Sequence, residues 1–521
     1  MNRELRCLSA LLLFTTSLQA QALRVGKITI EPLDVYSRTE ENRGSFYRLA
    51  DRLHIETHRS VIAKFLLFHE GDEYQPARLE ETERNLRALT FLKSASVTAS
   101  APHDGVVDVT VITQDSWSIA PETQAGSGGG KNTYGATLTE NNLLGTGKDV
   151  ELGWNKGVDR SQILLAYNDP ALILPYLRAH FGYAHTSDGY NRQFNLRRSF
   201  FSFATPWSAD TSFNAIRQDD RLYRGGVEVS RIGENHRDYG AGYGFAINPN
   251  DQYANRISAG FRFIDDDFAP ILDHAGFRTS REFRYLYVRF EHAQNDYLKL
   301  NFINKDLRYE DFDLGRTYAI DAAVSPRALG VNSTTEFVRA VGGEGFRLGD
   351  SAFFMPSASV STRLASGIQN SIASANLLYV HREGDTYPRT FVGHLAVRSG
   401  WRMDPELQFF ADGLNGLRGY RAHMFEGSRS IVVNLEERFY LGEEILQLAS
   451  PAVVGFIDAG NASSGGLGAL MSLKTDIGVG IRVGLPRTPK NLLRIDFAYA
   501  LNRDPLGRRG FLVSFSSGQA F

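Results

Sequence analysis

The chain has little cysteine, little proline and no excess of charge of either sign. Its single cysteine, Cys7, excludes a disulfide framework and a metal site built from several cysteines. With 57 basic and 59 acidic residues, the net charge of -2 gives no electrostatic basis for nucleic-acid binding. After the N-terminus, no stretch approaches the roughly 18 apolar residues of a membrane-spanning helix. A helical membrane protein is therefore excluded, whereas a barrel is not, since its strands need only about 10 alternating residues.

Glycine and aromatic residues are abundant. The 521 residues include 49 Gly, 34 Phe and 22 Tyr, against 17 Pro. This combination is typical of many strands and turns rather than of helices. The composition therefore predicts a mainly β protein.

Residues 1–22 have the features of a secretory signal peptide. Two arginines precede the apolar stretch Leu8–Leu18, and Ala20-Gln21-Ala22 has the small-x-small form of a cleavage site. A buried first helix is the alternative. Because Cys7 lies within this segment, export and cleavage would leave a mature chain without cysteine.

The segment 23–119 predicts a small α+β domain. Alternation and amphipathic spacing indicate a strand, two helices and two more strands: Lys27–Glu31, His58–Phe68, a helix from Pro76, Ala95–Ser100 and Val106–Thr113. This order resembles a polypeptide-transport-associated (POTRA) domain, and Gly71–Leu92 is the part most like that family. The resemblance implies a periplasmic domain.

Residues 120–131 are rich in glycine. Gly126–Gly130 followed by Lys131 is a weak match to a phosphate loop, because Asn132 occupies the place of the Ser or Thr that the motif needs. A flexible hinge between two domains is the prediction.

From residue 132 to residue 521 apolar residues alternate with small or charged ones. Clear examples are Ile477–Leu485 and Leu493–Leu501. The pattern fits a soluble sandwich or a membrane barrel, and periodicity alone does not separate them. Together with the export signal, it favours a transmembrane antiparallel β-barrel of about sixteen strands, at about 25 residues for each strand and its loop. A direct count of the alternating segments gives about sixteen to twenty. Strand boundaries between Arg221 and Arg382 are not defined by the pattern.

Several motifs resemble the BamA/TamA family of outer-membrane assembly proteins. They occur in the family's order and end on a terminal Phe, which resembles the signal that assembly machinery reads in outer-membrane barrels. These are Glu140–Gly147, Tyr167–Pro170, Gly416–Tyr420, Phe456–Gly460, Gly478–Arg482 with Leu493–Asp496, and Phe511, Val513 and Phe515 before Phe521.

The resemblance implies a loop that folds into the barrel lumen. Its motif here is Leu417-Arg418-Gly419-Tyr420. In the family the loop arginine pairs with lumen-facing carboxylates, and the matching positions are Glu436 and Asp458. An arginine between two carboxylates makes strong fork-like hydrogen bonds. The alternatives are a loop held only for stability and, for Gly419, an ordinary turn glycine.

The barrel seam is the second implied site. The first strand, near 132–142, would meet the last strand, 510–521. Gly518 lies three residues before Phe521 and would weaken the last strand, exposing an edge for strand addition. The alternative is that Gly518 marks only the end of the strand.

By resemblance the protein would assist insertion, assembly or translocation of polypeptides at the outer membrane of a Gram-negative bacterium. The implied partners are membrane lipid, unfolded or nascent outer-membrane and secreted polypeptides, and other subunits of an assembly machinery. The alternative is a two-partner-secretion-type translocator or a passive pore. We find no catalytic motif and expect no enzyme activity, cofactor or metal. Asp265-Asp266-Asp267 fits a cation site less well than a solvated loop.

Overall fold

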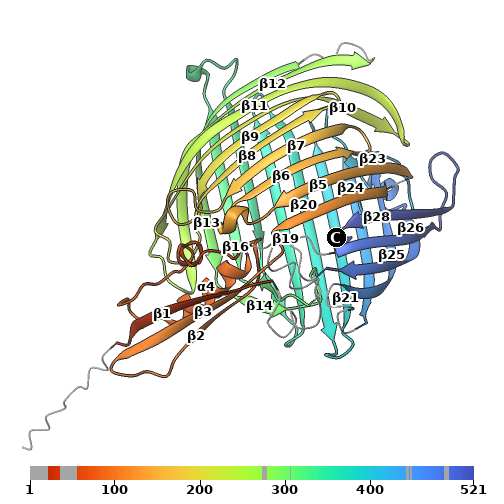
Figure 1. Ribbon diagram of the computed structural model, residues 1–521. Coiled ribbons are helices and arrows are strands. Elements are labelled where there is room, and N and C mark those ends of the chain that lie inside the picture. Colours follow the sequence, from red (N-terminus) through yellow and green to blue (C-terminus); the bar gives the residue numbers. More distant parts are fainter. Residues whose placement is uncertain are drawn as a thin grey trace, which may run out of the picture.

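The computed structural model describes residues 22–35, 55–128, 130–272, 279–305, 307–441, 445, 449–485 and 492–520. Nearly all of the predicted signal peptide, 1–22, and the terminal Phe521 lie outside these residues. The described chain forms a small N-terminal unit and a large, strongly curved sheet (Figure 1). No described helix is long and apolar enough to cross a membrane.

The N-terminal unit is a three-stranded sheet with two helices. Its elements are β1 (Arg24–Leu33), α3 (Arg59–Ala63), α4 (Pro76–Arg87), β2 (Leu92–Ala99) and β3 (Val106–Asp115), and the strand order is β1-β3-β2. β1 runs parallel to the central β3 and β2 runs antiparallel to it. Apolar residues of both helices and of the sheet form one core, with Ile62, Phe65 and Leu86 fully buried. Its assignment as a POTRA domain stays a prediction.

The first helix is shorter than the predicted His58–Phe68. The helix α3 ends at Ala63, and turns follow it. Phe65 and Phe68 are nevertheless buried in the core. The apolar spacing therefore marks which residues face the core, but it does not require that they share one helix.

The large sheet is antiparallel, and its strand order returns from β28 to β4, which is the order of a closed barrel. Its strands are β4 (Ile119–Gly128), β5 (Lys131–Glu140), β6 (Asp149–Lys156), β7 (Ser161–Asp169), β8 (Leu177–Thr186), β9 (Gly189–Arg198), β10 (Trp207–Arg224), β11 (Val227–Ile247), β12 (Tyr253–Leu272), β13 (Thr279–Gln294), β16 (Thr317–Ser325), β17 (Thr335–Gly343), β18 (Phe346–Arg347), β19 (Ala352–Leu364), β20 (Ile368–Glu383), β21 (Arg389–Trp401), β24 (Arg429–Tyr440), β25 (Ser450–Ser463), β26 (Lys474–Gly484), β27 (Leu492–Ala500) and β28 (Phe511–Ser517).

The length-based estimate of about sixteen strands is too low, whereas the upper end of the counted range, about twenty, is close to the structure. Within the described residues this sheet contains 21 strands, of which β18 has only two residues. Several hairpins are tight: two residues separate β8 from β9, and two separate β10 from β11. The allowance of about 25 residues for each strand and loop was therefore too generous.

The predicted hinge at 120–131 and the predicted first strand near 132–142 are both wrong. Residues 119–128 form β4, which pairs with β5 from Ile119↔Glu140 to Gly128↔Lys131. The glycines therefore belong to the first hairpin of the barrel. The seam lies between β4 and β28. Glycine content alone does not distinguish a linker from a strand whose neighbours supply the pairing.

The two faces of the large sheet differ in polarity. On β26, Ile477, Val479 and Ile481 are exposed, whereas the alternate residues Asp476 and Arg482 are completely buried. Since successive side chains of a strand point to opposite faces, an apolar outer surface surrounds a charged interior.

Candidate functional site

The connection between β21 and β24, residues 402–428, folds into the interior of the large sheet. It contains the short strands β22 (Phe409–Phe410) and β23 (Glu426–Gly427), which pair with each other. Leu417, Tyr420 and Phe425 of this loop pack with residues of β24, β25 and β27 in one buried core. The loop therefore has an apolar anchor on the inner wall.

Arg418 is the charged anchor of the loop, and its side chain is only 5% exposed. Its Nε and Nη2 donate to the two carboxylate oxygens of Asp458 at 2.8 and 2.9 Å. Its Nη1 donates to Glu436 Oε2 at 2.7 Å, and the guanidinium carbon lies 3.4 Å from the centre of the Phe456 ring. The structure thus brings together the three residues that the family resemblance pairs, in a two-pronged contact with Asp458.

Further charges surround Arg418. Glu436 also accepts from Arg438 Nε at 2.7 Å, and Arg482 Nη1 donates to Asp496 Oδ1 at 2.6 Å. We call the following eight residues the arginine cluster: Arg418, Arg438, Arg482, Arg494, Glu436, Asp458, Asp476 and Asp496. The four arginines form ion pairs with Glu436, Asp458 and Asp496, and such pairing is how buried charges are tolerated.

The strand register explains why these residues meet. Asp458 lies opposite Asn434 on β24 and opposite Asp476 on β26. Asn434 Nδ2 donates to Asp458 Oδ1 at 2.7 Å and to the carbonyl of Gly416 at 2.6 Å. Facing pairs share one side of a sheet, so β24 to β27 present their charged side chains to the same interior surface.

The neighbours of Arg418 in the motif fix the loop against this wall. Tyr420 Oη donates to the carbonyl of Thr475 at 2.9 Å. A Cβ atom on Gly419 would lie 2.5 Å from the Cβ of Asp476, so this glycine permits a close approach to β26. Gly419 is therefore more than an ordinary turn residue.

Sequence reasoning missed most of the arginine cluster. Arg482, Arg494 and Asp496 entered only as parts of motifs, and Arg438 and Asp476 were not considered. A usable signal existed, because each of these residues is next to an apolar residue on its strand, namely Phe439, Ile477, Ile481, Leu493 and Phe497. A charge at an inward position of a barrel strand points to a partner in the interior.

The first family-like motif, Glu140–Gly147, joins the N-terminal unit to the barrel. Asn142 Nδ2 donates to Thr57 Oγ1 at 2.8 Å, and Thr57 Oγ1 donates to Asp115 at 2.8 Å. A Cβ on Gly145 would lie 2.5 Å from the carbonyl oxygen of Glu56, and one on Gly147 would lie 2.9 Å from Phe91. These glycines allow the two parts to touch.

An insert between β13 and β16 forms a second junction, which sequence reasoning did not find. It contains the hairpin of β14 (Tyr297–Leu300) and β15 (Glu310–Asp313). On the side of the N-terminal unit, Arg87 donates to both oxygens of Asp311 at 2.9 and 2.6 Å. No local pattern signals this insert, because its contacts are with residues distant in the sequence.

The same insert reaches the arginine cluster. The carbonyl of Ile303 accepts from Arg438 Nη1 at 2.6 Å, and the carbonyl of Phe302 accepts from Thr390 Oγ1 at 2.8 Å. Phe302 also contacts Tyr440, with ring centres 5.0 Å apart. The insert therefore occupies the barrel end next to the N-terminal unit (Figure 1).

The seam residues have different surroundings. β28 has seven residues, fewer than any other described barrel strand except the two-residue β18. Phe515 lies on its exposed face. Gly518, with φ +79°, directly follows the strand, and its N–H donates to the carbonyl of Leu492. Gly518 thus stands at the end of β28 and not within it, and Phe521 is not described.

Comparisons with known proteins identify similar structures only. The sequence matches no known family model and no curated protein. BamA from Haemophilus ducreyi lacking POTRA domains 1–3 is similar over 95% of this chain and 84% of its own, with 13% identity and a TM-score of 0.40. CdiB from Acinetobacter baumannii covers 96% of this chain and 74% of its own, with 13% identity and a TM-score of 0.49. CdiB from Escherichia coli is similar over 96% of this chain and 76% of its own, with 11% identity and a TM-score of 0.46.

Proposed function

We propose that this protein is an outer-membrane barrel that inserts or translocates polypeptides, with its N-terminal unit acting as a periplasmic POTRA domain. The observation that carries the proposal is the internal loop 402–428, anchored by Arg418 on Glu436 and Asp458. The motif around Arg418 resembles the loop signature of the BamA/TamA family. An apolar outer face around a charged interior is the polarity that lipid requires of a barrel.

The seam between β4 and β28 is the proposed working edge. A strand of seven residues offers few backbone pairing positions, and Gly518 stops its extension. A weakly held edge strand exposes N–H and C=O groups that an incoming strand can pair with. In this mechanism strand pairing and lipid burial supply the free energy, and no cofactor takes part.

A passive pore is disfavoured by the contents of the interior. The loop 402–428 is anchored on one wall, and the insert between β13 and β16 occupies the end near the N-terminal unit. A translocator, which would have to move these segments during transport, is the second candidate. The interior cavity of ≈ 1160 Å³ beside the loop favours it, since a substrate path needs such space.

Depletion of the protein followed by outer-membrane proteomics tests the proposal. We expect many barrel proteins to decrease together if the protein is an assembly factor. Loss of a single secreted protein would instead indicate a dedicated translocator. An unchanged outer membrane and secretome would contradict both functions.

A disulfide across the seam tests the mechanism. One cysteine in β4 and one in β28 should block function when oxidised and restore it when reduced, because the chain has no cysteine other than Cys7. The matched control locks two strands that stay paired, through Val479 and Phe497 of β26 and β27. Equal activity of the seam-locked and control-locked proteins would place transport in the interior of the barrel.

A further inference from the structure

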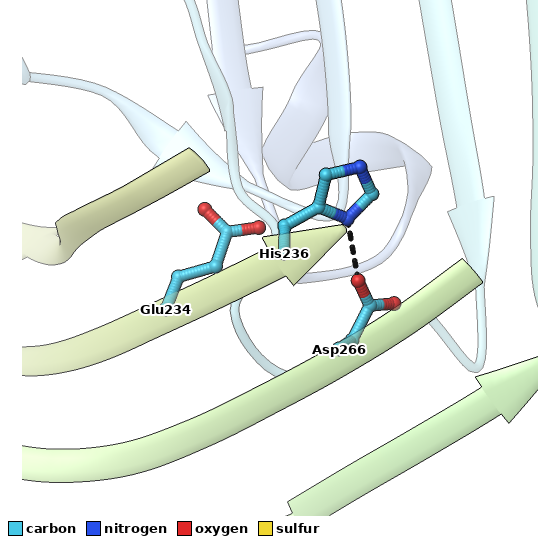
Figure 2. Close-up of side chains that lie close together, drawn as sticks. All are labelled: Glu234, His236 and Asp266. Carbon is cyan, nitrogen blue, oxygen red and sulfur yellow. Dashed lines mark hydrogen bonds and ion pairs between the residues drawn. The ribbon is translucent and has the colours of Figure 1, made fainter. Parts of the chain in front are cut away.

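A second group of charged side chains lies inside the barrel, on β11 and β12. Glu234, His236 and Asp266 each offer a ligand atom, and these atoms lie within 4.8 Å of one another. Figure 2 shows the three side chains close together, with Glu234 and His236 on one strand and Asp266 on its neighbour. We call these three residues the Glu234 site. The prediction that Asp265–Asp267 form a solvated loop is wrong, because these residues belong to strand β12.

The strand register builds this arrangement. Glu234 and His236 are two positions apart on β11, so their side chains share a face. His236 lies directly opposite Asp266 in the register of β11 and β12. Three side chains from two rigid strands therefore converge without any loop.

The charges of the Glu234 site are not matched by cations. Among the described residues, no arginine or lysine forms an ion pair with Glu234 or Asp266. Arg281 lies opposite Asp266 on β13, but its guanidinium binds Asp404 at 2.8 Å and also binds Glu406.

More negative charge lies nearby. The amide nitrogen of Gln218 donates to Glu234 at 2.8 Å and to Asp220 at 3.1 Å, which holds these two carboxylates near each other. Glu406 also interacts electrostatically with both. Glu406 pairs with Arg281 through Oε1, whereas its other carboxylate oxygen is buried without a hydrogen-bond partner, and its side chain is 9% exposed. The single charge of Arg281 is thus shared between Asp404 and Glu406, which leaves none for Glu234 and Asp266.

We propose that the Glu234 site binds a divalent transition-metal cation of the Zn²⁺ class. One imidazole and two carboxylates are suitable ligands for zinc, and three protein ligands leave a position for water. His236 Nδ1 and Asp266 Oδ1 are 2.6 Å apart, a contact that requires a hydrogen atom between them. For His236 Nδ1 to bind zinc, the hydrogen must leave that nitrogen: a neutral imidazole then carries it on Nε2, and an imidazolium releases it to water. Asp266 and Glu234 would bind as carboxylates.

The position of the site gives the cation access and a structural effect. The three residues line the interior cavity of ≈ 1160 Å³, which leaves room for an ion to reach them. A bound ion would link β11 to β12 and neutralise part of the local negative charge. The site is independent of the proposed transport function.

Zinc titration of the purified mature chain in detergent, after removal of metals with a chelator, tests the proposal. We expect one Zn²⁺ per chain by calorimetry, a zinc-dependent rise in Tm that EDTA reverses, and little competition from Mg²⁺. His236→Ala and Glu234→Gln should each weaken binding by about tenfold or more. Wild-type affinity in either variant, or the absence of saturable binding, would overturn the proposal.

His103→Ala is the matched control. His103 and Asp108 form an exposed histidine–aspartate pair at 3.7 Å in the N-terminal unit, outside any three-ligand group that the described residues form. This variant should bind zinc like the wild type. A loss of zinc affinity equal to that of His236→Ala would show adventitious surface binding and contradict the assignment. If His236→Ala does not migrate as a folded barrel, Asp266→Asn replaces it in the same comparison.

Discussion

Two charged groups lie on opposite parts of the same barrel wall, and they differ in how their charges are matched. In the arginine cluster four arginines form ion pairs with Glu436, Asp458 and Asp496, and Arg418 comes from the loop that the cluster holds. At the Glu234 site two carboxylates and a histidine converge, and Arg281, which lies opposite Asp266 on β13, is engaged by Asp404 and Glu406. In the first arrangement each arginine pairs with a carboxylate of the cluster, whereas in the second neither Glu234 nor Asp266 pairs with an arginine or lysine among the described residues. The paired cluster anchors a loop, and the unpaired group is the proposed cation site.

The same contrast occurs on a smaller scale on helix α4. Burial raises the pKa of Glu81 above its ordinary value, and a hydrogen bond from the backbone of Phe203 offsets only part of this. Burial acts on Glu83 in the same direction. There, hydrogen bonds from Val97 and Lys299 and the charge of Arg87 outweigh it and lower the pKa of Glu83. For these two glutamates, hydrogen-bond donors and nearby positive charges, more than burial, decide whether the charged form is stabilised.

Removal of Arg418 should have the largest effect. Arg418→Ala leaves Asp458 buried without its arginine partner and removes one of the arginines of Glu436, and breaking such a buried pair costs roughly 3–5 kcal/mol. We expect a much lower temperature for the loss of the compact, fast-migrating band on detergent gels. The control is Arg347→Ala, which removes a half-exposed ion pair with Asp296 and should cost about 0–1 kcal/mol. Equal shifts in the two variants would show that the cluster does not hold the barrel together.

Gly419→Ala should have an intermediate effect. The added methyl group would lie 2.5 Å from the Cβ of Asp476, so either the loop or β26 must move, at a cost of about 1–3 kcal/mol. Gly455→Ala on β25 is the control, because no atom lies within 4 Å of the added Cβ. Denaturant unfolding of both variants measures the difference. If Gly419→Ala does not change the free energy of unfolding, the loop is not packed tightly against β26.

Glu81→Gln should have the smallest effect, with opposite sign. Because the folded-state pKa of Glu81 is raised, its ionised form costs stability above that pKa, and the cost disappears as the pH falls toward the ordinary value of 4.5. The variant keeps an oxygen for the Phe203 N–H and should be slightly more stable at pH 8, by about 0.5 kcal/mol. Trypsin release of the N-terminal unit at pH 8 and pH 5 measures this. Glu83→Gln should instead lose stability at pH 8.

Local alternation carries most of the information about strands. The alternating segments Ile477–Leu485 and Leu493–Leu501 correspond to β26 and β27, because successive side chains of a strand point to opposite faces of the sheet. The number of strands did not follow, since it depends on hairpin length. The glycine-rich segment was misread because its pairing partners, and not its composition, make β4 a strand.

The two interior sites differ in how much of each could be predicted from the sequence. A motif resemblance led to Arg418, Glu436 and Asp458, which the structure brings together. Neither the remaining members of the arginine cluster nor the Glu234 site could be assembled in this way. His236 meets Asp266 only through the register of β11 and β12, and register depends on the whole sheet.

One chemical change made at both sites tests the contrast most directly. Glu436→Gln and Glu234→Gln each remove one negative charge and keep the shape of the side chain. With a chelator present, we predict that Glu436→Gln lowers the free energy of unfolding by roughly 3–5 kcal/mol, because Arg418 and Arg438 lose their shared anion. Glu234→Gln should leave it unchanged or raise it, because a like-charge contact is relieved. Losses of equal size at the two positions would contradict the account.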